Sequence, residues 1–154
     1  MLHGAEVIDG EVLGQRAGRT TVGHRFLACG TLSLAHADEY EARLEAEGRV
    51  VPSFAKRLAT IRERVAALAG AHTVAAGDAL FDEVTGLVEW PAVYAGTFAQ
   101  AFLDVPQECL MLTMKQNQKY FPLLDGNGKL VNRFLVVSNM DLADPSQIVH
   151  GNER

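Results

Sequence analysis

The chain has 154 residues, enough for one domain with its own core, and 48% of them are hydrophobic, as is ordinary for a globular protein. Its formal net charge of −5 would repel a polyanion if it were spread evenly, which disfavours general, sequence-independent nucleic-acid binding. No apolar run is long enough to cross a bilayer, and the first residues lack the basic and apolar blocks of a signal peptide. A cytoplasmic protein without a membrane partner is therefore expected.

Glycine punctuates the first 34 residues and separates short apolar or β-branched stretches. This spacing predicts short strands and tight turns, with strands at 20–22, 25–27 and 31–34. The glycines are Gly4, Gly10, Gly14, Gly18, Gly23 and Gly30.

Helices are predicted for the middle of the chain. The first begins with Asp38 as its N-cap and ends near Gly48. The second follows Pro52 and ends at Gly70, because apolar residues recur there at steps of four, three, four and three and so share one face. These residues are Phe54, Leu58, Ile61, Val65 and Leu68.

A third helix is predicted with Asp78 as its N-cap. Its expected buried residues are Leu80, Val84, Leu87 and Val88. After the break at Trp90 and Pro91, the pattern predicts a strand over 92–96, a short helical turn over 99–103 and a helix from Pro106 to about Met114.

A β-hairpin is predicted late in the chain. Apolar runs over 120–124 and 129–137 flank Asp125-Gly126-Asn127-Gly128, and these turn residues tolerate the backbone of a tight reversal. The second run is apolar enough over 134–137 to be a central strand that is buried on both faces.

Together these elements predict an α+β fold, with a mixed, largely antiparallel sheet and helices packed against it. The sheet is expected to combine the glycine-rich N-terminal strands with the late hairpin, in one domain over 1–140. Asp144-Pro145 predicts the start of another helix, and only about two turns of sequence follow. We therefore interpret 141–154 as the start of a truncated helix and the sequence as a fragment of a longer protein.

Motifs of catalysis or metal binding are missing from the sequence. Cys29 and Cys109 lie far apart among apolar residues and are expected to be free, buried thiols. His36 and Asp38 are the nearest approach to a ligand pair, but Asp38 is better explained as a helix cap. We predict no catalytic residue, no metal site and no bound cofactor in this chain.

Two stretches could contact a phosphate. In the first, His24 and Arg25 follow Gly23 on a predicted strand edge, where they could hold an anion or could be plain surface residues. The second runs from Met114 to Pro122 and carries lysines for phosphates, amides for sugar or base edges, and Tyr120 to stack on an unpaired base. Its alternative is a solvated connector with Tyr120 and Phe121 facing the core. A basic helix face over 56–64 is expected to be a solvated face.

These stretches also carry a resemblance to a known family. Successive blocks of the sequence resemble landmarks of the bacterial glycyl-tRNA synthetase beta subunit family, in order and over the full length of the chain. The blocks are AGRTTVGHRFL at 17–27, DEVTGLVEWP at 82–91, MKQNQKYFP at 114–122, and VSNM at 137–140 with GNER at 151–154.

The resemblance implies a much longer beta subunit that works with a separate alpha subunit. In the family the alpha subunit holds the class II site for ATP, glycine and the tRNA 3′ end, so ATP and Mg belong to the holoenzyme and this fragment alone is expected to be noncatalytic. This part of the beta subunit is similar to the B3/B4-type domain of the phenylalanyl-tRNA synthetase beta chain. Its expected role in glycine-tRNA ligase is to support acceptor-arm recognition of tRNA(Gly) and subunit assembly in protein synthesis.

Charge and loop placement, rather than the resemblance, select the candidate tRNA contacts. They are Arg19, His24, Arg25, Lys115, Gln116, Asn117, Gln118, Lys119 and Tyr120. One alternative is a small editing-type hydrolase that uses His24 and Arg25 in a cleft, although a pocket for glycine excludes larger amino acids by steric clash and leaves little need for editing. The other is a purely structural interaction module.

Overall fold

The computed structural model describes residues 1–141, and its contacts divide the chain into two compact units, Met1–Phe54 and a second that begins at Ala55 and is described over 55–141. We call these the first and the second unit and describe each by itself. One domain over 1–140 was expected from the sequence. The helix expected from Asp144 lies outside the described residues.

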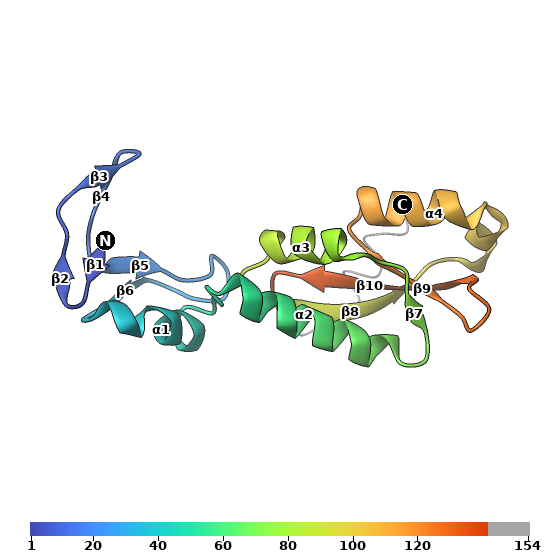
Figure 1. Ribbon diagram of the computed structural model, residues 1–154, viewed down its shortest axis with the longest axis horizontal. Helices are drawn as coiled ribbons and strands as arrows, with labels where there is room; N and C mark the ends of the chain where they lie inside the picture. The colour runs from blue at the N-terminus through green and yellow to red at the C-terminus, as the bar shows by residue number, and fades with distance from the viewer. Residues whose placement is uncertain (142–154) are drawn as a thin grey trace. The chain divides into compact units, whose positions relative to one another are not determined.

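The first unit is built from short antiparallel hairpins, as the glycine spacing predicts (Figure 1). Left-handed backbone at Gly4 (φ 60°), Gly14 (φ 75°) and Gly30 (φ 88°) fits tight turns and loops that favour glycine. The paired strands are β1 (Leu2–His3) with β2 (Glu6–Val7), β3 (Glu11–Val12) with β4 (Gln15–Arg16), and β5 (Thr20–Val22) with β6 (Thr31–Ser33).

These pairs are separate two-stranded sheets, so the expected single sheet of N-terminal strands and late hairpin is wrong. The strand expected at 25–27 is also wrong, because the backbone turns there. The cause is His24, whose Nδ1 accepts the amide hydrogens of Phe26 and Leu27, each at 3.2 Å. Amides used in this way are not available to a strand ladder.

A 3-10 turn, η1 (Ala37–Glu39), leads into helix α1 (Tyr40–Ala46), which ends close to the predicted Gly48. The predicted cap is wrong. His36 is the N-cap of the 3-10 turn, and its Nδ1 accepts the amide hydrogen of Asp38 at 3.3 Å. Asp38 therefore lies inside the turn that it was expected to cap.

The second unit contains a four-stranded sheet in the order β7-β9-β10-β8, with every neighbouring pair antiparallel (Figure 1). The late hairpin and the central position of its second strand are confirmed. The strands are β7 (Thr73–Val74), β8 (Ala92–Thr97), β9 (Phe121–Leu124) and β10 (Leu130–Ser138). The helices are α2 (Phe54–Ala69), α3 (Asp78–Leu87), the 3-10 helix η2 (Gln100–Asp104) and α4 (Gln107–Gln116).

Helix α2 ends at Ala69, where Gly70 takes a φ of 60°, as predicted. Its apolar stripe is confirmed for Ile61 and Val65, which are buried, while Phe54 is exposed. The remaining stripe residues, Leu58 and Leu68, are partly buried against the same core.

Helix α3 departs from its prediction at both ends. Its N-cap is Gly77, so Asp78 is the first helical residue instead of the cap. Leu87 is exposed, whereas Phe81, which was not among the expected core residues, is buried. The burial of Leu80, Val84 and Val88 is confirmed.

Both faces of the sheet are covered by packed side chains. Successive residues of a strand point to opposite faces, so neighbouring residues of β10 belong to different clusters. Leu135 of β10 packs with the helices α2 and α3 in a cluster that also includes Phe121 and Leu123 of β9. Its neighbour Phe134 packs in a second cluster with Met114 of α4 and Tyr120. The expectation that β10 is buried on both faces is thus met at Phe134 and Leu135.

The basic face of α2 is largely solvated, as expected, since Lys56, Arg62 and Arg64 are exposed, although its arginines also make contacts within the second unit. Arg62 Nη2 lies 2.7 Å from Asp78 Oδ1, and its guanidinium carbon lies 4.5 Å from the centroid of the Phe81 ring. Arg57 and Arg64 donate to the carbonyl oxygens of Thr85 and Pro91. These arginines therefore tie α2 to α3 and to the chain that follows it.

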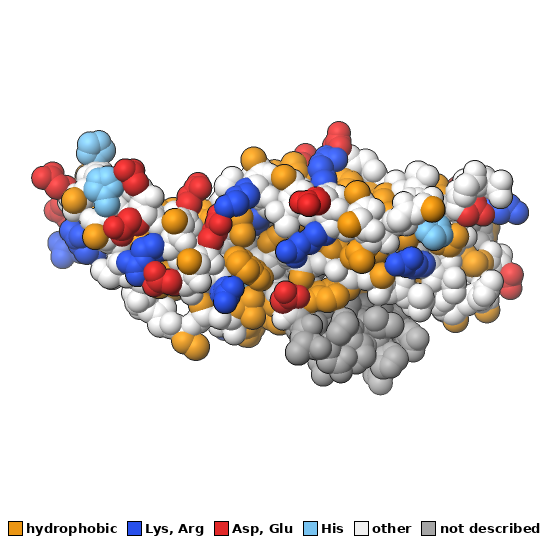
Figure 2. Space-filling view, turned by 90° about the horizontal axis from the view of Figure 1, so that it is seen from below, with side chains coloured by type: hydrophobic (Ala, Val, Ile, Leu, Met, Phe, Trp, Pro, Cys, Tyr) orange, Lys and Arg blue, Asp and Glu red, His pale blue; other side chains and the backbone are white. Residues whose placement is uncertain are grey.

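Charges of both signs mix on the face of the molecule drawn in Figure 2, where lysine and arginine side chains are interspersed with acidic ones. Over residues 1–141, no helix has the length and apolar character that a membrane crossing requires. Cys29 and Cys109 are free, as expected, but both are exposed rather than buried.

Candidate functional site

Loop 115–119, which covers the end of α4 and the residues after it, is the first candidate site. The amide of Asn117 donates to the carbonyl of Thr113 at 3.0 Å, and that of Tyr120 donates back to Met114 at 2.9 Å. Lys119 has a φ of 57°, the left-handed backbone that commonly closes a helix and that usually belongs to glycine. A lysine in this conformation costs about 1 kcal/mol or more of backbone strain. Such strain persists only where the surrounding structure holds the backbone in place, so the loop is fixed by its neighbours.

Side chains of this loop face in different directions. Lys119 Nζ lies 2.6 Å from Oε1 of Glu83 on α3, and both side chains are partly exposed. The three amides Gln116, Asn117 and Gln118 are exposed, and Lys115 is partly exposed. The loop therefore presents amide groups to solvent between two lysines, one of which is held by a carboxylate.

Tyr120 does not belong to the solvent-facing set. Its side chain is 7% exposed, and its ring stacks on Phe134 with a centroid distance of 4.3 Å and an interplanar angle of 15°. Burial also raises the pKa of the Tyr120 hydroxyl above its ordinary value. Stacking on an unpaired base, as the sequence suggested, is incompatible with this placement. The alternative, with Tyr120 and Phe121 facing the core, agrees with the structure, and Tyr120 anchors the loop.

The second candidate site is the turn over 23–28, which surrounds a buried histidine. His24 is 1% exposed, and its backbone amide donates to the carbonyl of Gly48 at 2.7 Å. It is neither a surface residue on an edge strand nor open to a phosphate. The editing-type hydrolase needs His24 in a cleft, and this burial removes the residue on which that alternative depends.

Two glycines permit this packing. A Cβ on Gly23 would lie 2.5 Å from the carbonyl oxygen of Gly48 and 2.8 Å from Cβ of Ala28, closer than real side chains approach. The turn over 23–28 thus sits directly on the segment that ends α1. Sequence reasoning missed this contact, since each glycine by itself predicts only a turn.

Arg19 and Arg25 differ in how they are used. Arg19 donates to the carbonyl oxygens of Leu34 at 3.3 Å and Ala5 at 3.1 Å, so it holds loops of the first unit together. Arg25 is exposed, and its guanidinium carbon lies 5.9 Å from the centroid of the Phe26 ring. Only Arg25 of this pair has its guanidinium beside an exposed aromatic ring.

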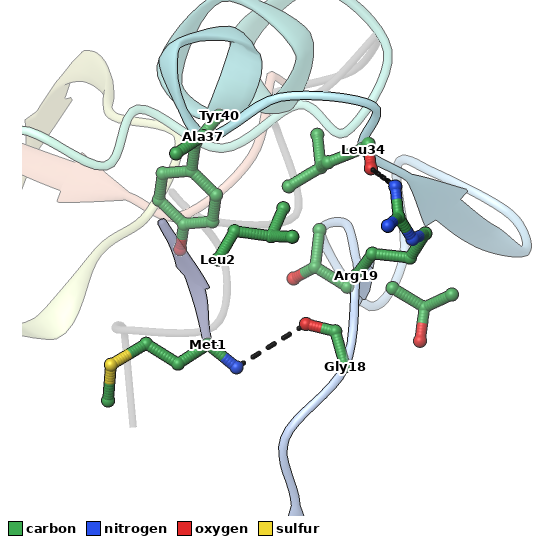
Figure 3. A pocket seen from close by; sticks show the side chains of 9 residues that line it. Met1, Leu2, Gly18, Arg19, Leu34, Ala37 and Tyr40 are labelled. Carbon is green, nitrogen blue, oxygen red and sulfur yellow. Dashed lines mark hydrogen bonds between the residues drawn. The ribbon is translucent and has the colours of Figure 1, made fainter. Parts of the chain in front are cut away.

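A pocket of about 350 Å³ lies beside Arg19 in the first unit. Figure 3 shows Leu2 between Tyr40 and Leu34, with the guanidinium of Arg19 turned to the carbonyl oxygen of Leu34. Because that cation is already bonded to carbonyl groups, the pocket offers mainly apolar contacts.

The candidate residues therefore form two groups. Arg19, His24 and Arg25 lie in the first unit, and the six residues 115–120 lie in the second. Sequence reasoning missed Phe26 and Glu83 as members of these sites. In the part of the chain that is described, no three His, Cys, Asp or Glu side chains come together in a way that could hold a metal ion.

The described residues thus define an α+β protein whose candidate sites are loops bearing cations, amides and an exposed aromatic ring. The family model for the glycyl-tRNA synthetase beta subunit matches residues 1–154, and the chain belongs to that family. The resemblance stated from the sequence is confirmed.

The sequence is also similar to known beta subunits along its whole length. It is 55% identical over 156 residues to the glycine–tRNA ligase beta subunit of Neisseria gonorrhoeae and 56% identical over 156 residues to that of Aromatoleum aromaticum, and 100% of the chain is covered in both. The beta subunit of Nitrosomonas eutropha is 55% identical over 99% of the chain. The chain spans 22–23% of the length of these relatives.

Proposed function

We propose that this chain serves glycyl-tRNA synthesis as part of the beta subunit of a cytoplasmic glycine-tRNA ligase. The observation that carries the proposal is the match to beta subunits at 55–56% identity over the whole chain. In this proposal the segment, a B3/B4-like part of the subunit, supports recognition of the tRNA(Gly) acceptor arm and subunit assembly. The alpha subunit supplies the site for ATP and Mg, and this chain contributes no catalytic residue.

Loop 115–119 is the proposed RNA contact of the second unit. Lysine ammonium groups bind phosphates, and exposed amides can bond to sugar and base edges, so Lys115 and Gln116 to Gln118 supply both kinds of contact. The ion pair between Lys119 and Glu83 is partly exposed. Ion pairs on protein surfaces typically contribute only about 0–1 kcal/mol to stability. A tRNA phosphate can therefore compete with the carboxylate for Lys119 at low cost.

Removing both lysine charges is expected to weaken tRNA binding and to lower its salt dependence. The variant is Lys115→Gln with Lys119→Gly, made in the complete enzyme of alpha and full-length beta subunits. Glycine suits position 119 because the backbone there is left-handed. Each lost phosphate contact should reduce the slope of log K against log salt by about 1, so the double variant should lose about 2. The measurement is binding of unmodified tRNA(Gly) across a salt series.

Lys129→Gln is the matched control, because it removes one exposed lysine from the β9–β10 turn of the same unit. It should leave the salt slope within experimental error of the unaltered enzyme. An unchanged slope in the double variant would contradict the RNA contact and would favour the purely structural role. Aminoacylation with glycine, measured in parallel, should show a higher KM for tRNA with an unchanged KM for ATP, since no ATP contact is assigned to this chain.

A further inference from the structure

Phe26 is one of the large hydrophobic residues that the first unit leaves exposed. Its side chain is 72% exposed, although its backbone belongs to a turn that is hydrogen-bonded to the buried His24. Single exposed apolar residues are common on protein surfaces, so exposure alone carries nothing. Two features of its surroundings indicate a binding role: the fixed backbone of the turn and the neighbouring guanidinium group.

The turn that contains Phe26 is fixed by hydrogen bonds to His24. The buried imidazole of His24 accepts the amide hydrogens of Phe26 and Leu27, and the carbonyl of His24 accepts the amide of Ala28 at 3.0 Å. The backbone amide of His24 is itself bonded to Gly48 at 2.7 Å. The backbone at Phe26 is therefore tied to the body of the unit, and the ring is offered to solvent from a defined position.

The neighbour of the ring is a cation. Arg25 is exposed, and its guanidinium carbon lies 5.9 Å from the centroid of the Phe26 ring, within the range of a cation–π contact. An aromatic face beside a guanidinium is the arrangement that proteins use for single-stranded nucleic acid, where a base stacks on the ring and a cation meets the backbone.

We propose that Arg25 and Phe26 bind one unpaired nucleotide of the tRNA, with the base stacked on Phe26 and a phosphate at Arg25. His24 is a positioning residue in this site, because it acts through the backbone of the turn. The proposal rests on the function proposed above and adds to it a stacking site formed by residues of the first unit, in addition to the phosphate contacts proposed for loop 115–119.

Three substitutions of Phe26 separate stacking from simple apolar contact. Phe26→Tyr keeps the aromatic face, Phe26→Leu keeps apolar volume without it, and Phe26→Ala removes both. In the complete enzyme, Phe26→Leu and Phe26→Ala should each weaken binding of unmodified tRNA(Gly) by about 5- to 150-fold, the usual range for one lost base stack. Phe26→Tyr should stay within about twofold of the unaltered enzyme because every base can still stack. Since Phe26 is mostly exposed, all three variants should fold.

Arg25→Gln tests the phosphate half of the site. It should lower the slope of log K against log salt by about 1. Equal affinities for Phe26→Leu and Phe26→Tyr, with the unaltered enzyme binding normally, would overturn the stacking site and leave the proposed function standing. A loss of alpha–beta association in Phe26→Ala, seen by analytical ultracentrifugation, would overturn it in favour of protein docking. Failure of the unaltered enzyme to bind tRNA(Gly) would instead overturn the proposed function itself.

Discussion

Replacing Phe121 by alanine is expected to destabilise the second unit by about 3–5 kcal/mol, the usual cost of removing a fully buried phenylalanine ring. Phe121 is 0% exposed, and its ring lies 4.8 Å from that of Phe81 on α3. It belongs to the cluster that joins β9 to Ile61 and Val65 of α2, so the cavity would open where sheet and helices meet. Because a whole domain is stable by only about 5–15 kcal/mol, this one change should remove a large part of that stability.

Phe102→Ala is the matched control for this prediction. Phe102 is 53% exposed on the 3-10 helix η2, so the same change of residue removes a ring that is largely in water already. We expect it to cost no more than about 1 kcal/mol. Denaturant unfolding of both variants measures the difference, and equal losses of stability would contradict the assignment of Phe121 to the core.

Replacing Phe134 by alanine should cost a similar amount, about 3–5 kcal/mol, and should also release loop 115–119. Phe134 is 3% exposed and stacks on Tyr120. The Phe134 ring lies over Gly96 of the neighbouring strand β8, where an added Cβ would come within 2.5 Å of Cζ of Phe134. The ring is thus the support of Tyr120, and Tyr120 anchors the loop.

Amide hydrogen exchange separates the two effects. Under conditions where both variants are folded, the Tyr120 amide, which donates to Met114, should exchange faster in Phe134→Ala than in Phe121→Ala. The affinity of the complete enzyme for tRNA(Gly) should likewise fall further in Phe134→Ala than in Phe121→Ala. Equal exchange at Tyr120 in the two variants would show that the loop does not depend on the Phe134 ring.

Local chemistry explains the parts of the fold that the sequence predicts. In the late hairpin, one oxygen of Asp125 accepts the amides of Asn127 at 2.8 Å and Lys129 at 2.9 Å, within five residues of sequence. The bonds from Lys129 and Asn127 lower the pKa of Asp125, as expected for a carboxylate that accepts amide hydrogens. The stop of α2 at Gly70 is equally local. Such features depend only on neighbouring residues, so a single sequence is enough to find them.

Contacts between distant residues explain what the sequence does not predict. The burial of His24 depends on Gly48, and the position of Arg62 depends on Asp78 and Phe81. A pattern along the chain identifies a cation or an imidazole but not the carbonyl, carboxylate or ring that it meets. For the same reason Tyr120, which is polar enough for a binding loop, was placed among the candidate RNA contacts although its ring packs on Phe134.

The most direct measurement is photo-crosslinking from loop 115–119 to RNA. A photoreactive phenylalanine analogue in place of Gln118, which is exposed, would be irradiated in the complete alpha–beta enzyme with bound tRNA(Gly). The same analogue in place of Ala67, which is exposed on α2, is the control. A crosslink to tRNA(Gly) from position 118 and none from position 67 is the predicted result. A crosslink from position 118 to protein alone, or none at all, would contradict an RNA contact at this loop.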